Sequence, residues 1–359
     1  MNSVRGLVCL LVVALHVVGD ADSHGLHLRV ALGWHYVMQS IEFLRMPLFT
    51  ALSGYLYAGQ RATRREFGRF WVKKGRRLVI PFVFSTVVYW WLRDSACGHG
   101  MSLAHALLYE NGHLWYLQAL LLLFAGISVA DAFCHPTATG VILVGFATIM
   151  VMQSGEPMPI FFGVSGALYL APYFLFGTLL RDYPAWLRDK QFGALAFGIM
   201  IIVLASQQLG LLGLTVPVSV LQLPAAMCGM AGVVVLLQRF PENALLARIG
   251  SYSYTIYLWH VLAASTVRDG LIRLGVTAVP SLYVLSFLAA VAAPILLYHV
   301  ARRIPLMSVA VTGERSRRMA TLPARVVGAA VAAGWSTMLT SRCVDEKRNE
   351  FRPSHPTRA

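Results

Sequence analysis

Charged residues are scarce in this 359-residue chain, and acidic ones are the scarcest. Asp and Glu together number 16 and Lys and Arg 30, so 13% of the residues are charged, whereas 57% are hydrophobic. A soluble globular domain has about 25% charged residues, and the mean hydropathy of +0.63 lies far on the apolar side. This balance excludes an ordinary soluble globular protein and indicates an integral membrane protein.

Several motifs that would point to a known chemistry are missing as well. The cysteines, Cys9, Cys97, Cys134, Cys228 and Cys343, have no paired spacing of the kind that zinc sites use. The chain contains no phosphate-cradling GxxxxGK, no GxSxG nucleophile elbow and no HExxH motif. We therefore expect no metal site, and candidate chemistry has to come from ionisable residues inside apolar segments.

Apolar runs follow one another almost without a break and leave no room for a soluble domain. They predict an all-α integral membrane protein with about ten transmembrane helices. The predicted segments are 4–19, 38–58, 78–93, 114–131, 138–153, 162–180, 192–210, 217–238, 250–267 and 281–300. A further Ala/Gly-rich stretch at 326–339 is short, and we interpret it as an interfacial or cytoplasmic piece.

Lys and Arg residues predict the orientation. The loop between the second and third segments is strongly basic, so the positive-inside rule places it in the cytoplasm. Counting outwards places residues 181–191, 239–249 and the chain after residue 300 on the same side. The loop at 268–280, which has two Arg residues, fits less well. The pattern predicts that both termini are cytoplasmic.

The net charge of +14 follows from this topology, because basic cytoplasmic loops contact the anionic inner leaflet. We predict a transmembrane domain over residues 1–303 and a basic, partly disordered cytoplasmic tail over residues 304–359. No soluble basic module is visible, so no nucleic-acid partner is expected. A cleaved signal peptide is a rival interpretation of the start, and His16 and Asp20 in and beside the apolar core argue against it.

Two ionisable residues lie inside the first segment. Arg5 and His16 have ten residues between them. Eleven helical steps of ~100° bring both side chains to one face, roughly 16 Å apart along the axis. Ionisable groups inside a membrane helix are costly, so they usually face a cavity and have a function. His16 is the candidate for proton transfer, because an imidazole titrates near neutral pH.

Charged residues near the ends of the second and third segments have two interpretations each. Glu42 and Arg45 are three residues apart and can pair on one helix face. They form either a structural ion pair at the membrane edge or part of a site level with His16. Lys74 and Arg77 are also three residues apart. They either hold phosphate groups or anchor the loop at the cytoplasmic surface.

The fourth and ninth segments contain aromatic residues next to histidines. His113, Trp115 and Tyr116 begin the fourth segment, where Trp and Tyr are typical of an interfacial belt. His113 is alternatively a ligand for a sugar hydroxyl or a second proton carrier. His260 lies in the middle of the ninth segment, and we interpret it as a packing histidine that is hydrogen-bonded to a neighbouring helix.

Together these stretches resemble the membrane acyltransferase-3 family of bacterial O-acyltransferases over about residues 3–300. Arg5 and His16 match its Arg-x10-His signature. The other matching motifs are Met46-Pro47-Leu48-Phe49 with Ser53-Gly54-Tyr55-Leu56, Arg77-Leu78-Val79-Ile80-Pro81, His113-Leu114-Trp115-Tyr116-Leu117 and Ser253-Tyr254-Thr255-Ile256-Tyr257-Leu258-Trp259-His260. The chain looks similar to the fucose 4-O-acetylase-like branch of sugar O-acetylases. The family often has Arg-x-x-Arg before its third helix, and here Lys74 takes the place of the first arginine. A lysine keeps the positive charge but cannot bind phosphate through two parallel hydrogen bonds.

The resemblance implies an O-acyltransferase of the bacterial inner membrane. It would move an acyl group, with acetyl the expected one, from cytoplasmic acyl-CoA to a sugar hydroxyl of a surface or exported polysaccharide. Acetyl-CoA would be a donor substrate, with no tightly bound cofactor. His16 would be the general base. Independently of the resemblance, the depth of Glu42 in its helix places it level with His16, where it would orient the imidazole. The donor would meet Arg5, Lys74, Arg76 and Arg77, and the sugar would meet Arg45, His113, Trp115 and Tyr116.

A multi-pass transporter of a glycan or small solute is the alternative function. Interrupted helices, such as those at Met46-Pro47 and Ala293-Pro294, would suit a transporter, whereas no inverted repeat is visible between the two halves. A small-molecule or lipid acceptor and a covalent acyl-histidine step are further alternatives within the enzyme hypothesis.

Overall fold

The computed structural model describes residues 1–19, 25–26, 36–37, 40, 42–97, 100, 102–109, 112–216 and 221–314, with the backbone alone for 42–44 and 93–97. Within these ranges the regular secondary structure is helical and contains no strand. One isolated β-bridge pairs Tyr109 with Phe161. The predicted all-α class is confirmed.

Helices lie at all ten of the predicted segments. In order, the elements are α1 (Asn2–Val18), α3 (Glu42–Ala58), α4 (Phe67–Lys74), the π-helical turn η1 (Gly75–Val79), α5 (Ile80–Cys97), α6 (Leu103–Leu108), the short 3-10 helix η2 (Gly112–Leu114), α7 (Trp115–Val129), the π-helical turn η3 (Ala130–Cys134), α8 (Ala138–Gln153), α9 (Val164–Asp182), α10 (Pro184–Arg188), α11 (Lys190–Leu211), α12 (Gln222–Arg239), α13 (Ala244–Arg273), α14 (Val279–Ala301) and α15 (Pro305–Thr312).

Four helical stretches among the described residues are long and apolar enough to cross a membrane: Gly112–Cys134, Lys190–Leu211, Gln222–Arg239 and Val279–Ala301. The peripheral helices also turn apolar side chains outwards, among them Leu143 of α8, Ile202 of α11 and Leu296 of α14. Lipid solvates such faces, whereas water does not, so the structure supports a membrane protein. The total of ten crossings and the cytoplasmic side of both termini stay predictions.

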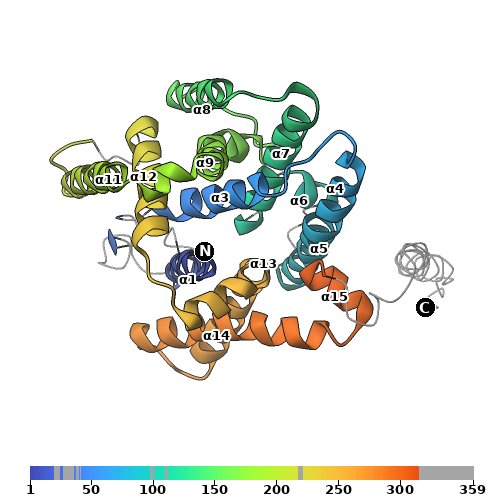
Figure 1. Ribbon diagram of the computed structural model, residues 1–359. Helices are drawn as coiled ribbons and strands as arrows, with labels where there is room; N and C mark the ends of the chain where they lie inside the picture. The colour runs from blue at the N-terminus through green and yellow to red at the C-terminus, as the bar shows by residue number, and fades with distance from the viewer. Residues whose placement is uncertain are drawn as a thin grey trace, which may run out of the picture.

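Helices α1 and α13 pack side by side near the middle of the bundle (Figure 1). Their backbones touch at Gly6 and Gly250. A Cβ atom added to Gly6 would lie 2.0 Å from the carbonyl oxygen of Leu246, and one added to Gly250 would lie 2.1 Å from that of Asn2. Small residues allow membrane helices to approach this closely. The contact sets the register of the two helices.

A second close pair joins α3 and α9. A Cβ atom on Gly54 would lie 2.0 Å from the carbonyl oxygen of Phe174, and one on Gly177 would lie 2.0 Å from that of Ala51. Contacts further along each pair, His16 with His260 and Arg61 with Asp182, show that α1 runs parallel to α13 and α3 runs parallel to α9. Parallel packing of the first segment with the ninth, and of the second with the sixth, is what alternating crossings require.

The chain beyond residue 303 begins with a helix that packs on the rest of the fold. In α15, which contacts α5, Val309 packs against Ile80. Gly313 then adopts a φ of 68° and lies against the backbone of Arg77. The domain boundary at residue 303 stays a prediction, and the predicted piece at 326–339 lies outside the described residues.

The close packing at Gly6 and Gly250 leads to a prediction about stability. We expect Gly250→Ala to force α1 and α13 apart, because the atoms in its way are backbone atoms, and to cost about 1–3 kcal/mol, as overpacking does. A thermal unfolding scan of the detergent-solubilised protein should show a lower midpoint. Gly126→Ala is the matched control, since nothing lies within 4 Å of the added Cβ. An unchanged midpoint for Gly250→Ala would contradict the close packing.

Candidate active site

Three histidines from three parts of the sequence meet in the interior. The ring centroids of His16 on α1 and His260 on α13 are 4.9 Å apart. His113 on η2 lies 5.1 Å from His260 and 6.0 Å from His16. His113 and His260 are buried, with 8% and 0% of their surface exposed. We call these three residues the histidine cluster.

Backbone carbonyl groups set the tautomer of each imidazole, because a carbonyl oxygen only accepts hydrogen bonds. Nδ1 of His16 donates to the Val12 carbonyl at 2.8 Å, and Nδ1 of His260 donates to the Tyr257 carbonyl at 2.8 Å. Nε2 is therefore the basic nitrogen of both rings. Nε2 of His113 lies 3.4 Å from the Leu258 carbonyl, which makes Nδ1 its basic nitrogen.

Nε2 of His260 has no hydrogen-bond partner among the described residues, although it is fully buried. Leaving a buried polar atom unsatisfied is unfavourable, and such atoms often mark a functional position. Nε2 of His260 can therefore accept a hydrogen bond from a ligand. In the described part of the chain no group of three His, Cys, Asp or Glu side chains is placed to hold a metal ion.

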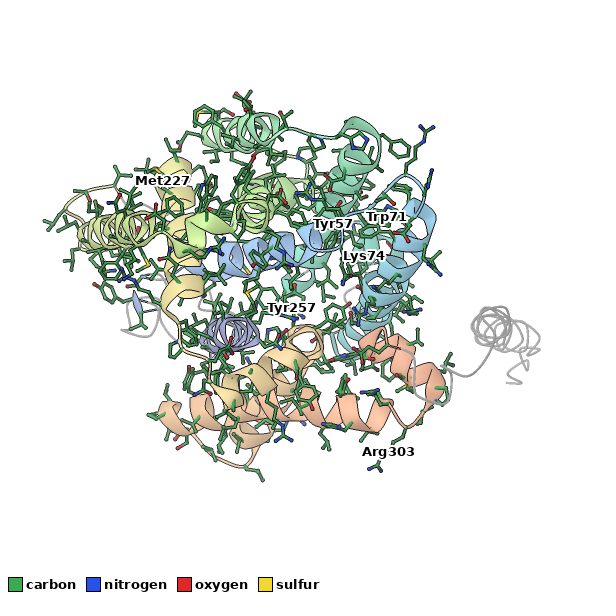
Figure 2. The ribbon with its side chains drawn as sticks, in the orientation of Figure 1. Tyr57, Trp71, Lys74, Met227, Tyr257 and Arg303 are labelled. Carbon is green, nitrogen blue, oxygen red and sulfur yellow. The ribbon has the colours of Figure 1, made fainter. Side chains whose placement is uncertain are left out.

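Aromatic side chains enclose the histidine cluster. The rings of Tyr89 and Tyr257 lie 5.2 Å and 5.7 Å from that of His113. The Tyr257 hydroxyl donates to the backbone carbonyl of His113, and the Tyr89 hydroxyl donates to that of Leu258 at 3.1 Å. Tyr257 lies near the centre of the bundle (Figure 2). These bonds attach η2 and α5 to α13 beside the cluster.

Arg5 lies at the other end of α1 and contacts α13. Its Nη2 donates to the hydroxyl of Ser253 at 3.0 Å. It also lies within electrostatic range of Tyr116 and Arg77. The structure therefore places Arg5 between the helix pair and the basic residues that precede α5, apart from His16. Its predicted contact with the donor stays a prediction.

The basic residues predicted to bind the donor lie in three different environments. The Lys74 ammonium lies 3.5 Å from the centroid of the Phe124 ring on α7. Burial, aided by the charges of Arg77 and Lys73, lowers the pKa of Lys74 to about 8. Arg76 is half-buried on η1. Arg77 is exposed, and its guanidinium lies 3.6 Å from the Glu314 carboxylate.

The other predicted residues are less closely associated with the histidine cluster. Arg45 is buried within α3, and Trp115 packs against Gly166 of α9. Tyr116 is buried with its ring 5.5 Å from that of Tyr257, which joins it to the aromatic surroundings of the cluster. The side chain of Glu42 lies outside the described residues, so its predicted role as an orienting carboxylate stays a prediction.

Sequence reasoning gave His260 a packing role and so left it out of the site. Its Nδ1 bonds to carbonyl groups of its own helix rather than of a neighbouring helix, and its ring faces His16. The signal was present in the sequence, because His260 is an ionisable residue in the middle of an apolar segment, as His16 is.

Comparison of the sequence with known proteins identifies the family of this chain. A stretch of 153 residues, 41% of this chain, is 26% identical to the nodulation protein NolL of Mesorhizobium japonicum (strain LMG 29417 / CECT 9101 / MAFF 303099) and covers 39% of that protein. No solved structure matches. The model of the acyltransferase-3 family, described as an acyltransferase domain, matches residues 1–299, which include all three histidines. The chain belongs to this acyltransferase family.

Proposed function

We propose that the protein is an integral-membrane O-acyltransferase of the bacterial inner membrane. It transfers an acyl group, in the simplest case acetyl, from cytoplasmic acyl-CoA to a hydroxyl of a sugar in a surface or exported polysaccharide. The observation that carries the proposal is the meeting of His16, His113 and His260 in the interior of a chain of the acyltransferase family. Family membership favours this enzyme over a transporter.

The transfer needs a group that takes a proton and returns it. The acceptor hydroxyl gives its proton to Nε2 of His16 while its oxygen bonds to the thioester carbonyl carbon. The carbon–sulfur bond then breaks, and the imidazolium returns the proton to the departing thiolate. Nε2 of His260 and Nδ1 of His113 accept hydrogen bonds from neighbouring sugar hydroxyls and hold the acceptor in place. A sugar suits this arrangement because it carries several hydroxyls.

The donor approaches from the basic side. Acyl-CoA carries phosphate groups, and Lys74, Arg76 and Arg77 supply cations for them. Support comes from α7, because Lys74 contacts Phe124 on the same helix that follows His113. His113 and Phe124 are eleven helical steps apart, or roughly 16 Å at 1.5 Å per step. The thioester arm of acyl-CoA, with about thirteen bonds from sulfur to phosphorus, is of similar length at ~3.6 Å per three bonds.

The catalytic role of His16 makes the first functional prediction. We expect His16→Gln to lower kcat for acyl transfer from acetyl-CoA by at least roughly 100-fold, because the general base is lost, while the thermal midpoint stays close to that of the wild type. The measurement is thiol release by the detergent-solubilised protein with a sugar acceptor. His105→Gln is the control, since this exposed histidine stacks on Tyr109 and lies outside the histidine cluster. Full activity in His16→Gln would refute the assignment.

The lowered pKa of Lys74 makes a second prediction, about pH. Below about pH 8 the side chain is an ammonium ion that can bind phosphate, and above it the charge is lost. We therefore expect kcat/KM for acetyl-CoA to fall as the pH rises through about 8. Lys74→Arg should remove this fall, because a guanidinium stays charged. If both proteins show the same profile above pH 8, Lys74 does not bind the donor phosphates.

A further inference from the structure

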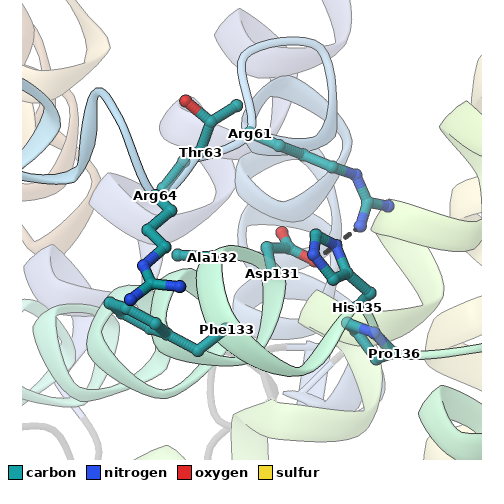
Figure 3. Close-up of a pocket in the computed structure, with 9 residues that line it drawn as sticks. Arg61, Thr63, Arg64, Asp131, Ala132, Phe133, His135 and Pro136 are labelled. Carbon is teal, nitrogen blue, oxygen red and sulfur yellow. Dashed lines mark hydrogen bonds and ion pairs between the residues drawn. The ribbon is translucent and has the colours of Figure 1, made fainter.

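A pocket of about 450 Å³ lies at the opposite end of α7 from the histidine cluster. It is formed by the loop between α3 and α4 and by the segment that begins with η3 (Figure 3). The first contributes Arg61 and Arg64, and the second contributes Asp131, Phe133 and His135. Its volume falls within the range of small-molecule sites, about 300–1,000 Å³.

One side of this pocket carries an ionic network around the buried Asp131 carboxylate. Nη1 of Arg61 donates to Asp131 at 2.8 Å, and its Nη2 pairs with Asp182 on α9. The Tyr57 hydroxyl donates to the second oxygen of Asp131 at 2.6 Å. The Asp131 carboxylate is thus bonded through both oxygens, and it shares the Arg61 guanidinium with Asp182, which does not line the pocket. Because Arg61 is engaged by two carboxylates, an anion in the pocket depends on Arg64 for its cationic partner.

The other side of the pocket offers a cation and an aromatic face. The Arg64 guanidinium lies 5.8 Å from the centroid of the Phe133 ring, and both side chains are exposed. His135 adds an imidazole, held in a left-handed backbone conformation at φ 47°. An aromatic ring stacks on a planar base, and Arg binds phosphate through two parallel hydrogen bonds. The chemistry fits a phosphorylated purine nucleoside.

Contacts of α4 with α7 and with η3, which continues α7, connect this pocket with Lys74. Phe67 at the start of α4 packs on Phe133, with ring centroids 5.5 Å apart, and Lys74 at its end lies over Phe124. Along the helical axis, Phe133 lies nine residues beyond Phe124, or roughly 14 Å at 1.5 Å per residue. A ligand that has a phosphate near Lys74 can therefore extend its other end into the pocket.

We propose that this pocket binds the nucleotide end of the donor, the adenine and the phosphorylated ribose of acyl-CoA, with the base on Phe133 and the ribose phosphate on Arg64. The inference rests on the proposed function, because it adds the remote half of the donor to the thioester and diphosphate positions described above. It assigns donor specificity to residues far from the bond that breaks.

A comparison of two donors tests the proposal. Acetyl-CoA carries the nucleotide, whereas S-acetyl-4′-phosphopantetheine carries the same thioester arm and ends at its phosphate. We expect Arg64→Ala to raise KM for acetyl-CoA by roughly tenfold, the loss of one charge-assisted contact, and to leave KM for the shorter donor unchanged. Phe133→Ala should do the same. Arg65→Ala is the matched control, because Arg65 is exposed in the same loop and does not line the pocket.

The possible failures are distinguishable. Equal KM values for the two donors in the wild type, or variants that raise both KM values equally, would overturn the pocket assignment and leave the proposed function intact. If neither donor is used, the proposed function fails. In that case the pocket assignment is tested by binding of labelled adenosine 3′,5′-bisphosphate to the detergent-purified protein. Binding that Arg64→Ala weakens supports the assignment. No binding, or binding that Arg64→Ala leaves unchanged, overturns the assignment.

Discussion

The backbone contact between Gly6 and Gly250 is the constraint on which the rest of the site depends. Because α1 and α13 run parallel from this contact, the residues ten positions beyond each glycine, His16 and His260, reach the same level. Their rings meet with centroids 4.9 Å apart. The atoms that face the glycines belong to the backbone, so no rotamer change would admit a larger residue. Two residues without functional groups thus position two that have them.

His113 reaches the cluster by a different route. It belongs to η2, which precedes α7, and the Tyr257 hydroxyl bonds its backbone carbonyl to α13. Burying an imidazole in an apolar interior is less costly when its N–H group has a partner. Each ring bonds one nitrogen to a backbone carbonyl, which makes the other nitrogen the basic one. The same hydrogen bonds that make burial tolerable therefore decide which nitrogen can accept a proton.

Local properties of the chain were predictable, and the relative placement of distant helices was not. Hydrophobicity located all the main helices, and the cost of an ionisable group in an apolar helix singled out His16. The same cost applied to His260, yet sequence reasoning gave it a packing role, because nothing in the local pattern shows that residues 244 apart share a level. The limits of α13 were also underestimated: it begins at Ala244, capped by the Asn243 side chain, and runs to Arg273 beyond the apolar stretch.

Helix α7, which follows His113, holds the histidine cluster and the pocket at Phe133 at a fixed separation. His113 precedes α7, Lys74 contacts Phe124 within it, and Phe133 lies in the π-helical turn that continues it. A hydrogen-bonded helix changes length very little, so these three positions keep their spacing even if loops on either side move. An elongated substrate held at several points along such a helix is oriented before it reacts, which converts binding energy at the remote end into correct placement of the reacting end. Under the proposed function, in which the two substrates arrive from opposite sides of the membrane, a helix that spans the distance is the simplest element that can provide this alignment.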